Sequence, residues 1–202
     1  MFELPTSVII EDEEYPIRER GDFRLVLDCF SALQDIELSE EGRIITALIL
    51  FYDDVLLDDS DSLYEIFNTN EKMKLAVKEM YNFFNCGADD SLVKKTNYRL
   101  IDWEKDTQMI AGAVNKVAGV EVRSLDYMHW WTFMGYYGNI GKSTMATVIN
   151  IRQKIKTGKK LEKYEREFRN ENPQYFVWNS STISQAEDDA WFDEIQQNFH
   201  KE

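Results

Sequence analysis

The 202-residue chain has little cysteine, proline or glycine: two, three and nine residues, respectively. Scarce proline and glycine favour a well-packed helical protein over a loop-rich or disordered one. A chain of this length buries a sizeable core without disulfide bonds or metals. Because Cys29 and Cys86 both lie in apolar stretches of helical pattern, we expect buried thiols and an intracellular setting.

Long apolar runs are also missing. No run approaches the ~20 residues that a membrane-spanning helix needs. The first ten residues, MFELPTSVII, lack the basic start and the long apolar centre of a signal peptide. We therefore expect a soluble, cytoplasmic protein with no membrane partner.

Familiar catalytic and metal-binding patterns are absent as well. The string GNIGKST at 138–144 resembles a phosphate-binding loop, but Tyr136 stands where that motif requires its first glycine. The aspartates between 53 and 61 do not place glycine at the sixth position of a calcium-binding loop. A lone histidine beside aromatic residues, as His129 is, indicates a packed residue with one hydrogen bond. The sequence thus predicts no enzyme, no cofactor and no metal site.

Charge is distributed unevenly along the chain, whose net charge is −14. Residues 1–71 hold 4 basic and 19 acidic residues, whereas residues 142–169 hold 9 basic and 3 acidic ones. Such an acidic chain is repelled by phosphate backbones, which disfavours nucleic acid as a partner. The basic segment has two candidate counterparts, the acidic N-terminal half of the chain and an acidic partner.

The hydrophobic pattern predicts a mainly α fold: a single multi-helix domain with a short N-terminal β-hairpin and a C-terminal appended helix. The hairpin is expected over residues 7–17, with its turn at Glu11–Asp12. Asp22, Ser39 and Asn70 are expected to cap helices. Apolar residues recur at helical spacing over 23–33, 44–51, 60–67, 73–84, 103–117, 127–137, 145–152 and 161–168.

Residues 100–137 are expected to form the centre of the core. The stretches 103–117 and 127–137 together predict an antiparallel helix pair, separated by a helix end at Gly119. We expect Phe30, Trp103 and Trp130 to be largely buried.

The domain organisation predicted is a helical domain over 1–171, a linker over 172–182 and an acidic amphipathic tail helix over 183–202. Asn172–Pro173 breaks the helical pattern before the linker. We expect the tail helix to dock reversibly near the basic segment 152–169. The alternative is a helix packed permanently in the core.

Several stretches together resemble a known family. They are SVII, YPI and DFR near the N-terminus, YNFFNCG, then IDWEKDTQMIAGAVN and MHWWTFMGYYG, followed by a basic helix. This order, over about residues 5–171, resembles the phage gene-product-fifteen family of tailed phages and prophages of Gram-positive bacteria. The turn at Glu11–Asp12 departs from the tighter Asp-Gly of the family, and the acidic tail is longer than usual.

The resemblance implies a non-catalytic tail assembly chaperone that binds the tape measure protein and aids tail tube assembly. It implies work in the host cytoplasm and absence from the mature virion. The major tail tube protein and a second copy of the chain are further candidate partners. The alternatives are a structural tail component retained in the virion and a small regulatory or host-interaction protein. Aromatic and apolar side chains are the candidate partner-binding residues: Trp131, Tyr136, Tyr137, Trp191, Phe192, Ile195 and Phe199.

Overall fold

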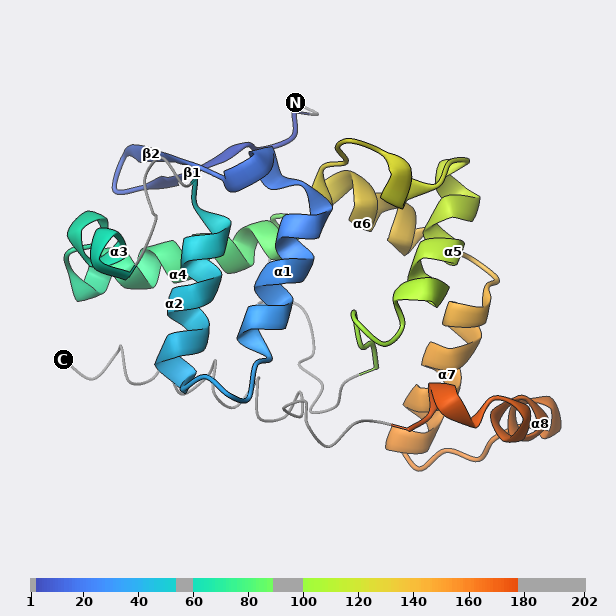
Figure 1. Cartoon of the computed structure of the whole chain (residues 1–202). Helices are drawn as coiled ribbons and strands as arrows, with labels where there is room; N and C mark the ends of the chain where they lie inside the picture. The colour runs from blue at the N-terminus through green and yellow to red at the C-terminus, as the bar shows by residue number, and fades with distance from the viewer. Residues whose placement is uncertain (1–2, 54–59, 89–99, 178–202) are drawn as a thin grey trace. The chain divides into compact units, whose positions relative to one another are not determined.

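The computed structural model describes residues 3–53, 60–88 and 100–177 (Figure 1). These residues form eight α-helices and one two-stranded antiparallel hairpin, so the predicted mainly α class is confirmed. By their contacts they divide into two compact units, one of Met1–Lys94 with Asp126–Met134, the other of Lys95–Leu125 with Gly135–Glu202. The predicted tail helix at 183–202, and the linker beyond residue 177, lie outside the described residues.

The hairpin joins β1 (Ser7–Ile10) to β2 (Glu13–Pro16), with Val8 opposite Tyr15. Its turn residues, Glu11 and Asp12, both have positive φ, at 51° and 66°. Two consecutive left-handed residues match the twist of the flanking strands in a two-residue hairpin loop. The turn predicted at Glu11–Asp12 is therefore confirmed.

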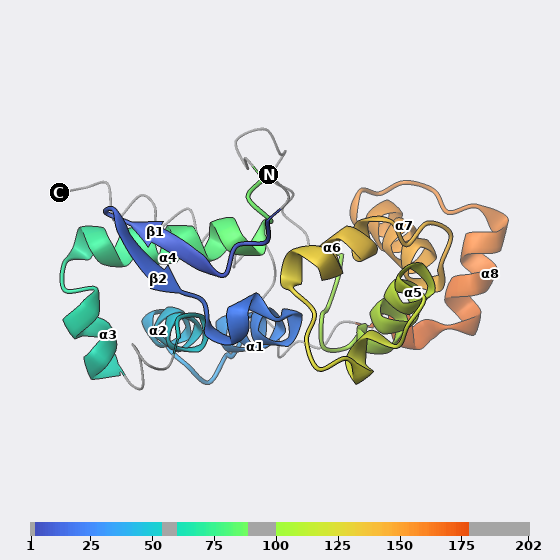
Figure 2. The same ribbon diagram turned by 90° about the horizontal axis from the view of Figure 1, so that it is seen from above.

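Among the described residues, four helices lie wholly in the first unit: α1 (Phe23–Leu33), α2 (Glu40–Phe51), α3 (Ser60–Ile66) and α4 (Asn70–Phe84). Figures 1 and 2 show α1 and α2 side by side and α4 running across the pair. The Asp22 side chain caps α1 and the Ser39 side chain caps α2, as predicted. The cap of α4 is Thr69, whose side chain accepts from the Lys72 N–H, so the prediction of Asn70 was wrong by one position.

The second unit contains α5 (Thr107–Ala118), α7 (Thr144–Lys156), α8 (Lys163–Glu171) and short 3₁₀ turns at Val122–Ser124 and Pro173–Tyr175. Gly119 ends α5 in the left-handed conformation, with a φ of 72°, as predicted. GNIGKST connects two helices, and its Ser143 caps α7. Neither the structure of these residues nor the spacing of their glycines is therefore that of a phosphate-binding loop.

Helix α6 (Trp130–Gly138) corrects the predicted central pair. It begins at Trp130, so Tyr127 precedes it, and residues Trp130–Met134 belong to the first unit. The helix packed against α5 is instead α7. Periodicity identified the helices but not their partners, because an apolar stripe does not specify which other stripe covers it.

Aromatic and aliphatic side chains fill both cores. Trp130 is 1% exposed, which agrees with its predicted burial, whereas Phe30 and Trp103 are only partly buried. Cys29 is buried and Cys86 is half-buried, and both are free thiols. Within the described residues, no helix is both long and apolar enough to cross a membrane.

Candidate functional site

Residues 126–134 return to the first unit after the chain has formed α5. The Phe23 N–H donates to the Met128 carbonyl at 2.9 Å, and the Met128 N–H donates to the Asp22 carboxylate at 2.8 Å. The other oxygen of that carboxylate accepts from the Arg24 N–H at the start of α1. One buried carboxylate thus caps a helix and holds a segment more than a hundred residues away in sequence.

His129 is buried and uses both ring nitrogens. Its Nδ1 accepts from the Trp131 N–H at 3.0 Å, so Nε2 carries the proton and donates to the Pro5 carbonyl at 2.9 Å. Burial lowers the pKa of His129 below 6.5, which keeps the ring neutral. The prediction of a packed histidine is confirmed, with two hydrogen bonds instead of one.

Trp130 and Trp131 both bind the end of α4. The Trp130 indole N–H donates to the Phe84 carbonyl at 2.8 Å, and the Trp131 indole N–H donates to the Phe83 carbonyl at 2.9 Å. Carbonyls in the last turn of a helix lack the usual partner within that helix, and the indole of Trp130 supplies one to Phe84. The Phe83 carbonyl accepts from the Cys86 N–H at 3.0 Å as well as from the Trp131 indole. The sequence His129–Trp131 therefore has a structural role, because its two indoles attach the start of α6 to the end of α4 within the first unit.

The predicted partner-binding residues are not gathered into one exposed site. Trp131 is half-buried against Phe83 and the backbone of Gly87. Tyr136 and Tyr137 are also half-buried. Trp191, Phe192, Ile195 and Phe199 lie outside the described residues. Partner binding by these seven residues stays a prediction.

Tyr137 has an unusual environment. Its ring packs on Trp103 with centroids 5.5 Å apart. Its hydroxyl is buried and has no hydrogen-bond partner within the part of the chain that the structure describes. Burial and the nearby Asp106 carboxylate, partly offset by Arg152, raise the pKa of Tyr137 to about 12. The phenol therefore stays protonated under all ordinary conditions.

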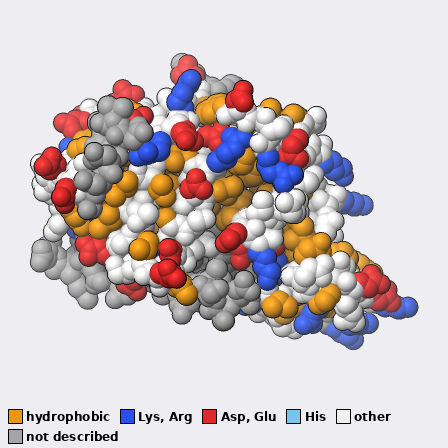
Figure 3. Space-filling view, in the orientation of Figure 1, with side chains coloured by type: hydrophobic (Ala, Val, Ile, Leu, Met, Phe, Trp, Pro, Cys, Tyr) orange, Lys and Arg blue, Asp and Glu red, His pale blue; other side chains and the backbone are white. Residues whose placement is uncertain are grey.

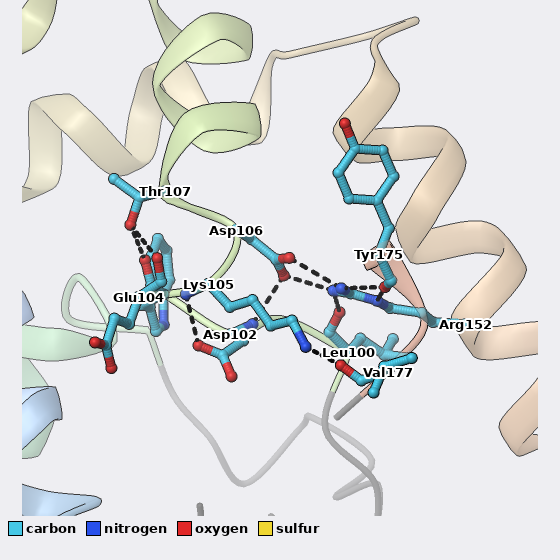
Figure 4. Close-up of polar contacts among 10 residues, drawn as sticks. Leu100, Asp102, Glu104, Lys105, Asp106, Thr107, Arg152, Tyr175 and Val177 are labelled. Carbon is cyan, nitrogen blue, oxygen red and sulfur yellow. Dashed lines mark hydrogen bonds and ion pairs between the residues drawn. The ribbon is translucent and has the colours of Figure 1, made fainter. Parts of the chain in front are cut away.

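Asp106 and Arg152 form a buried ion pair in the second unit (Figure 4). The guanidinium donates to the two carboxylate oxygens at 2.5 and 2.9 Å, and the two side chains are 1% and 3% exposed. Sequence reasoning missed Asp106. The available signal was Arg152 itself, an arginine on the apolar stripe of 145–152, since a buried cation requires a partner.

Arg152 also binds two backbone carbonyls, as Figure 4 shows. It donates to the Leu100 carbonyl at 2.8 Å and to the Tyr175 carbonyl at 3.0 and 2.6 Å. Next to it, the Lys105 ammonium donates to the Val177 carbonyl. Arg152 thereby connects Leu100, which precedes α5, with Tyr175, which follows α8. These contacts indicate a structural role for Arg152.

A second buried carboxylate holds α8 on α7. Glu165 is 0% exposed and accepts from Lys154 at 2.6 Å and from Asn150 at 2.8 Å. The Lys154 ammonium holds the pKa of the Glu165 carboxyl below its ordinary value. Two residues of the basic segment 142–169, Arg152 and Lys154, therefore have their counter-charges inside the unit.

The remaining cations of this segment are exposed. We call the exposed part of Ile155–Arg169 the basic α7–α8 surface. Figure 3 shows basic, acidic and apolar side chains together over the α7–α8 end. Its exposed apolar side chains are Ile155, at 39%, and Tyr164, at 59%. Its exposed cations are Lys156, Lys159, Lys160, Lys163, Arg166 and Arg169.

Among the described residues, no group of three or more histidine, cysteine, aspartate or glutamate side chains is arranged to hold a metal ion. The acidic residues Asp54, Asp58 and Asp59 lie outside them. The histidine, the thiol of Cys29 and the two buried carboxylate–cation pairs are each engaged in packing or in hydrogen bonds. The described surface therefore presents charged and apolar side chains to the solvent.

Comparison with known families identifies the chain. A family model described as bacteriophage Gp15 protein matches residues 1–176. The chain belongs to the bacteriophage Gp15 protein family. It is thus a phage protein, and the match covers every described residue except Val177. No curated protein and no solved structure matches this Gp15 family member.

Proposed function

We propose that this Gp15 family member is a non-catalytic tail assembly chaperone that binds the tape measure protein in the host cytoplasm and is left out of the mature virion. The observation that carries the proposal is its family membership over residues 1–176. The resemblance noted in the sequence implies this role. A long, mostly helical tape measure chain needs its apolar stripes covered before the tail tube assembles around it.

The use of polar side chains inside the fold supports a binding role. His129, Asp106 and Glu165 have the chemistry that catalysis commonly uses, but each is buried with its hydrogen bonds made to the chain itself. A catalytic base must reach the proton that it removes. Neutral and enclosed, His129 is unsuited to that task.

The charge of the chain also suits the proposed role. A net charge of −14 disperses a complex that would otherwise aggregate through apolar segments. Half-buried aromatic side chains such as Tyr136 supply rigid area for an amphipathic partner helix. Recognition of this kind is measured as binding of the partner and not as turnover of a substrate.

Coexpression with the tape measure protein of the same phage tests the proposal. The tape measure protein is expressed alone, with the full chain, and with an unrelated acidic helical protein of similar size. We expect it to become soluble and to copurify only with the full chain. If solubility and copurification are the same with the unrelated protein, the chaperone role is wrong.

Matched variants locate the contact. Tyr136→Ser removes a half-buried predicted binding residue, whereas Tyr64→Ser removes a ring that is 46% exposed on α3. We expect Tyr136→Ser to reduce copurification of the tape measure protein and Tyr64→Ser to leave it unchanged. Equal effects would remove Tyr136 from the binding surface while leaving the chaperone role intact.

Mass spectrometry of purified virions separates the chaperone from a structural tail component. A chaperone should be absent or present in traces after the tail is complete. A copy number that matches the subunits of the tail tube would show a retained component and would overturn the proposal.

A further inference from the structure

The basic α7–α8 surface carries more exposed cations than exposed carboxylates. Within 156–169, six exposed cations face two exposed carboxylates, Glu162 and Glu167, since Glu165 is buried against Lys154. The nearest of these pairs, Lys163 with Glu167, is 3.8 Å apart and well exposed. Such a pair contributes little, so most of this positive charge is available to an acidic ligand.

Apolar side chains lie among these cations. Tyr164 is 59% exposed between Lys163 and Glu165, and Ile155 is 39% exposed just before Lys156. Glu165 binds α7 through Lys154 and Asn150, which places the cations of α8 beside the end of α7. A ligand for this surface should therefore combine carboxylates with large apolar side chains.

The C-terminal segment of the chain has that composition. Residues 178–199 contain no lysine or arginine. Within 183–199, four large apolar residues, Trp191, Phe192, Ile195 and Phe199, stand beside five carboxylates, Glu187, Asp188, Asp189, Asp193 and Glu194. The described chain ends at Val177, and the segment is in the same chain as the surface.

The last described residues lie close to the surface. Arg152 of α7 holds the Tyr175 carbonyl, so the exit is attached to the helix whose end forms part of the surface. The first carboxylate, Glu187, follows Val177 by ten positions. That length of chain spans up to ~33 Å when extended, whereas the nine residues of α8 are ~13 Å long. The reach of this stretch therefore exceeds the length of α8.

We propose that the acidic segment 183–199 docks on the basic α7–α8 surface of its own chain. A short linker gives it an effective concentration on the order of millimolar. At this effective concentration, even a weak intrinsic affinity of the segment is enough to keep it bound to the surface. Apolar contact by Trp191 and Phe192 with Ile155 and Tyr164 accompanies the charge pairing. This proposal does not rest on the chaperone role and holds or fails without it.

Paramagnetic NMR on the full chain tests the docking. A nitroxide is attached at Ser184→Cys in a Cys86→Ser background, since Cys29 is buried. We expect loss of amide signals for residues 155–166. Lys159→Glu with Lys160→Glu should restore the signals, and adding Asp188→Lys with Asp189→Lys should remove them again.

Two controls make the result specific. Lys78→Glu with Lys142→Glu changes the charge equally at exposed lysines elsewhere, and should leave the broadening in place. Mixing isotope-labelled protein without nitroxide and unlabelled protein with nitroxide detects docking between copies. No broadening at 155–166, insensitivity to the charge changes, or broadening that the mixed sample reproduces would each overturn docking within one chain.

Discussion

The guanidinium of Arg152 donates to both carboxylate oxygens of Asp106, at 2.5 and 2.9 Å, across 46 positions of sequence. Both side chains are almost fully buried, in a unit whose core also contains apolar residues such as Ile110 and Val148. Removing two charges from water is costly, and their mutual attraction offsets that cost only when every group is paired. The extra bonds of Arg152 to Leu100 and Tyr175 complete that pairing.

Breaking this pair should destabilise the protein strongly. We expect Asp106→Leu or Arg152→Met alone to lower the free energy of unfolding by ~3–5 kcal/mol, because each leaves a buried charge without its counter-charge. The double variant should lose less than the two single losses combined. Urea denaturation of all four proteins measures the coupling, and additive losses would show that the pair does not act as a unit.

The two tryptophans should differ in their contribution to stability. Trp130 is 1% exposed, so Trp130→Ala should cost ~3–5 kcal/mol, the usual range for a large buried aromatic residue. Trp131→Phe keeps most of the ring and removes the hydrogen bond to Phe83, at a cost of ~0.5–1.5 kcal/mol. Thermal and urea unfolding measure both. An unchanged melting temperature for Trp130→Ala would contradict its place in the core.

His129 should make stability fall as the solution becomes mildly acidic. Burial lowers its pKa below 6.5 in the folded protein, while the unfolded chain protonates near 6.5. As pH falls below about 6.5, the unfolded state binds a proton that the folded state resists, so the free energy of unfolding decreases. Above that pH both states are neutral and the effect vanishes.

The measurement is unfolding free energy against pH for the wild-type protein and for His129→Gln. The variant should lose the part of the slope that lies just below pH 6.5. An NMR titration adds a direct reading, because His200 supplies a second imidazole signal that the variant retains. A His129 pKa at or above 6.5 would contradict the buried neutral ring.

Two glycines should respond in opposite ways to alanine. Gly21 has a φ of 76°, and an added Cβ would lie 2.5 Å from the Phe83 ring and 3.2 Å from His129. Gly112 lies exposed in the middle of α5, with no atom within 4 Å of an added Cβ. We expect Gly21→Ala to lower the melting temperature and Gly112→Ala to stabilise the protein by ~0.5–1 kcal/mol. Equal shifts would contradict the close packing at Gly21.

Local features were readable from the sequence because neighbouring residues decide them. The Glu11–Asp12 turn, the Asp22 and Ser39 caps and the Gly119 helix end each depend on hydrogen bonds or backbone angles within a few positions. The resemblance of residues 138–144 to a phosphate-binding loop was rejected for the same reason, because that motif is defined by the spacing of glycines within a few positions. Thr69 shows the limit, because Thr69 and Asn70, adjacent at the start of α4, are both residue types that suit a cap.

Pairings between distant segments were decided only by the tertiary structure. The Asp106–Arg152 pair, the indole bonds of Trp130 and Trp131 to the end of α4, and the return of residues 126–134 to Asp22 all join groups far apart in sequence. Apolar periodicity tells which face of a helix is buried but not which helix covers it. For that reason α5 was paired with α6 from the sequence, whereas the fold packs it against α7.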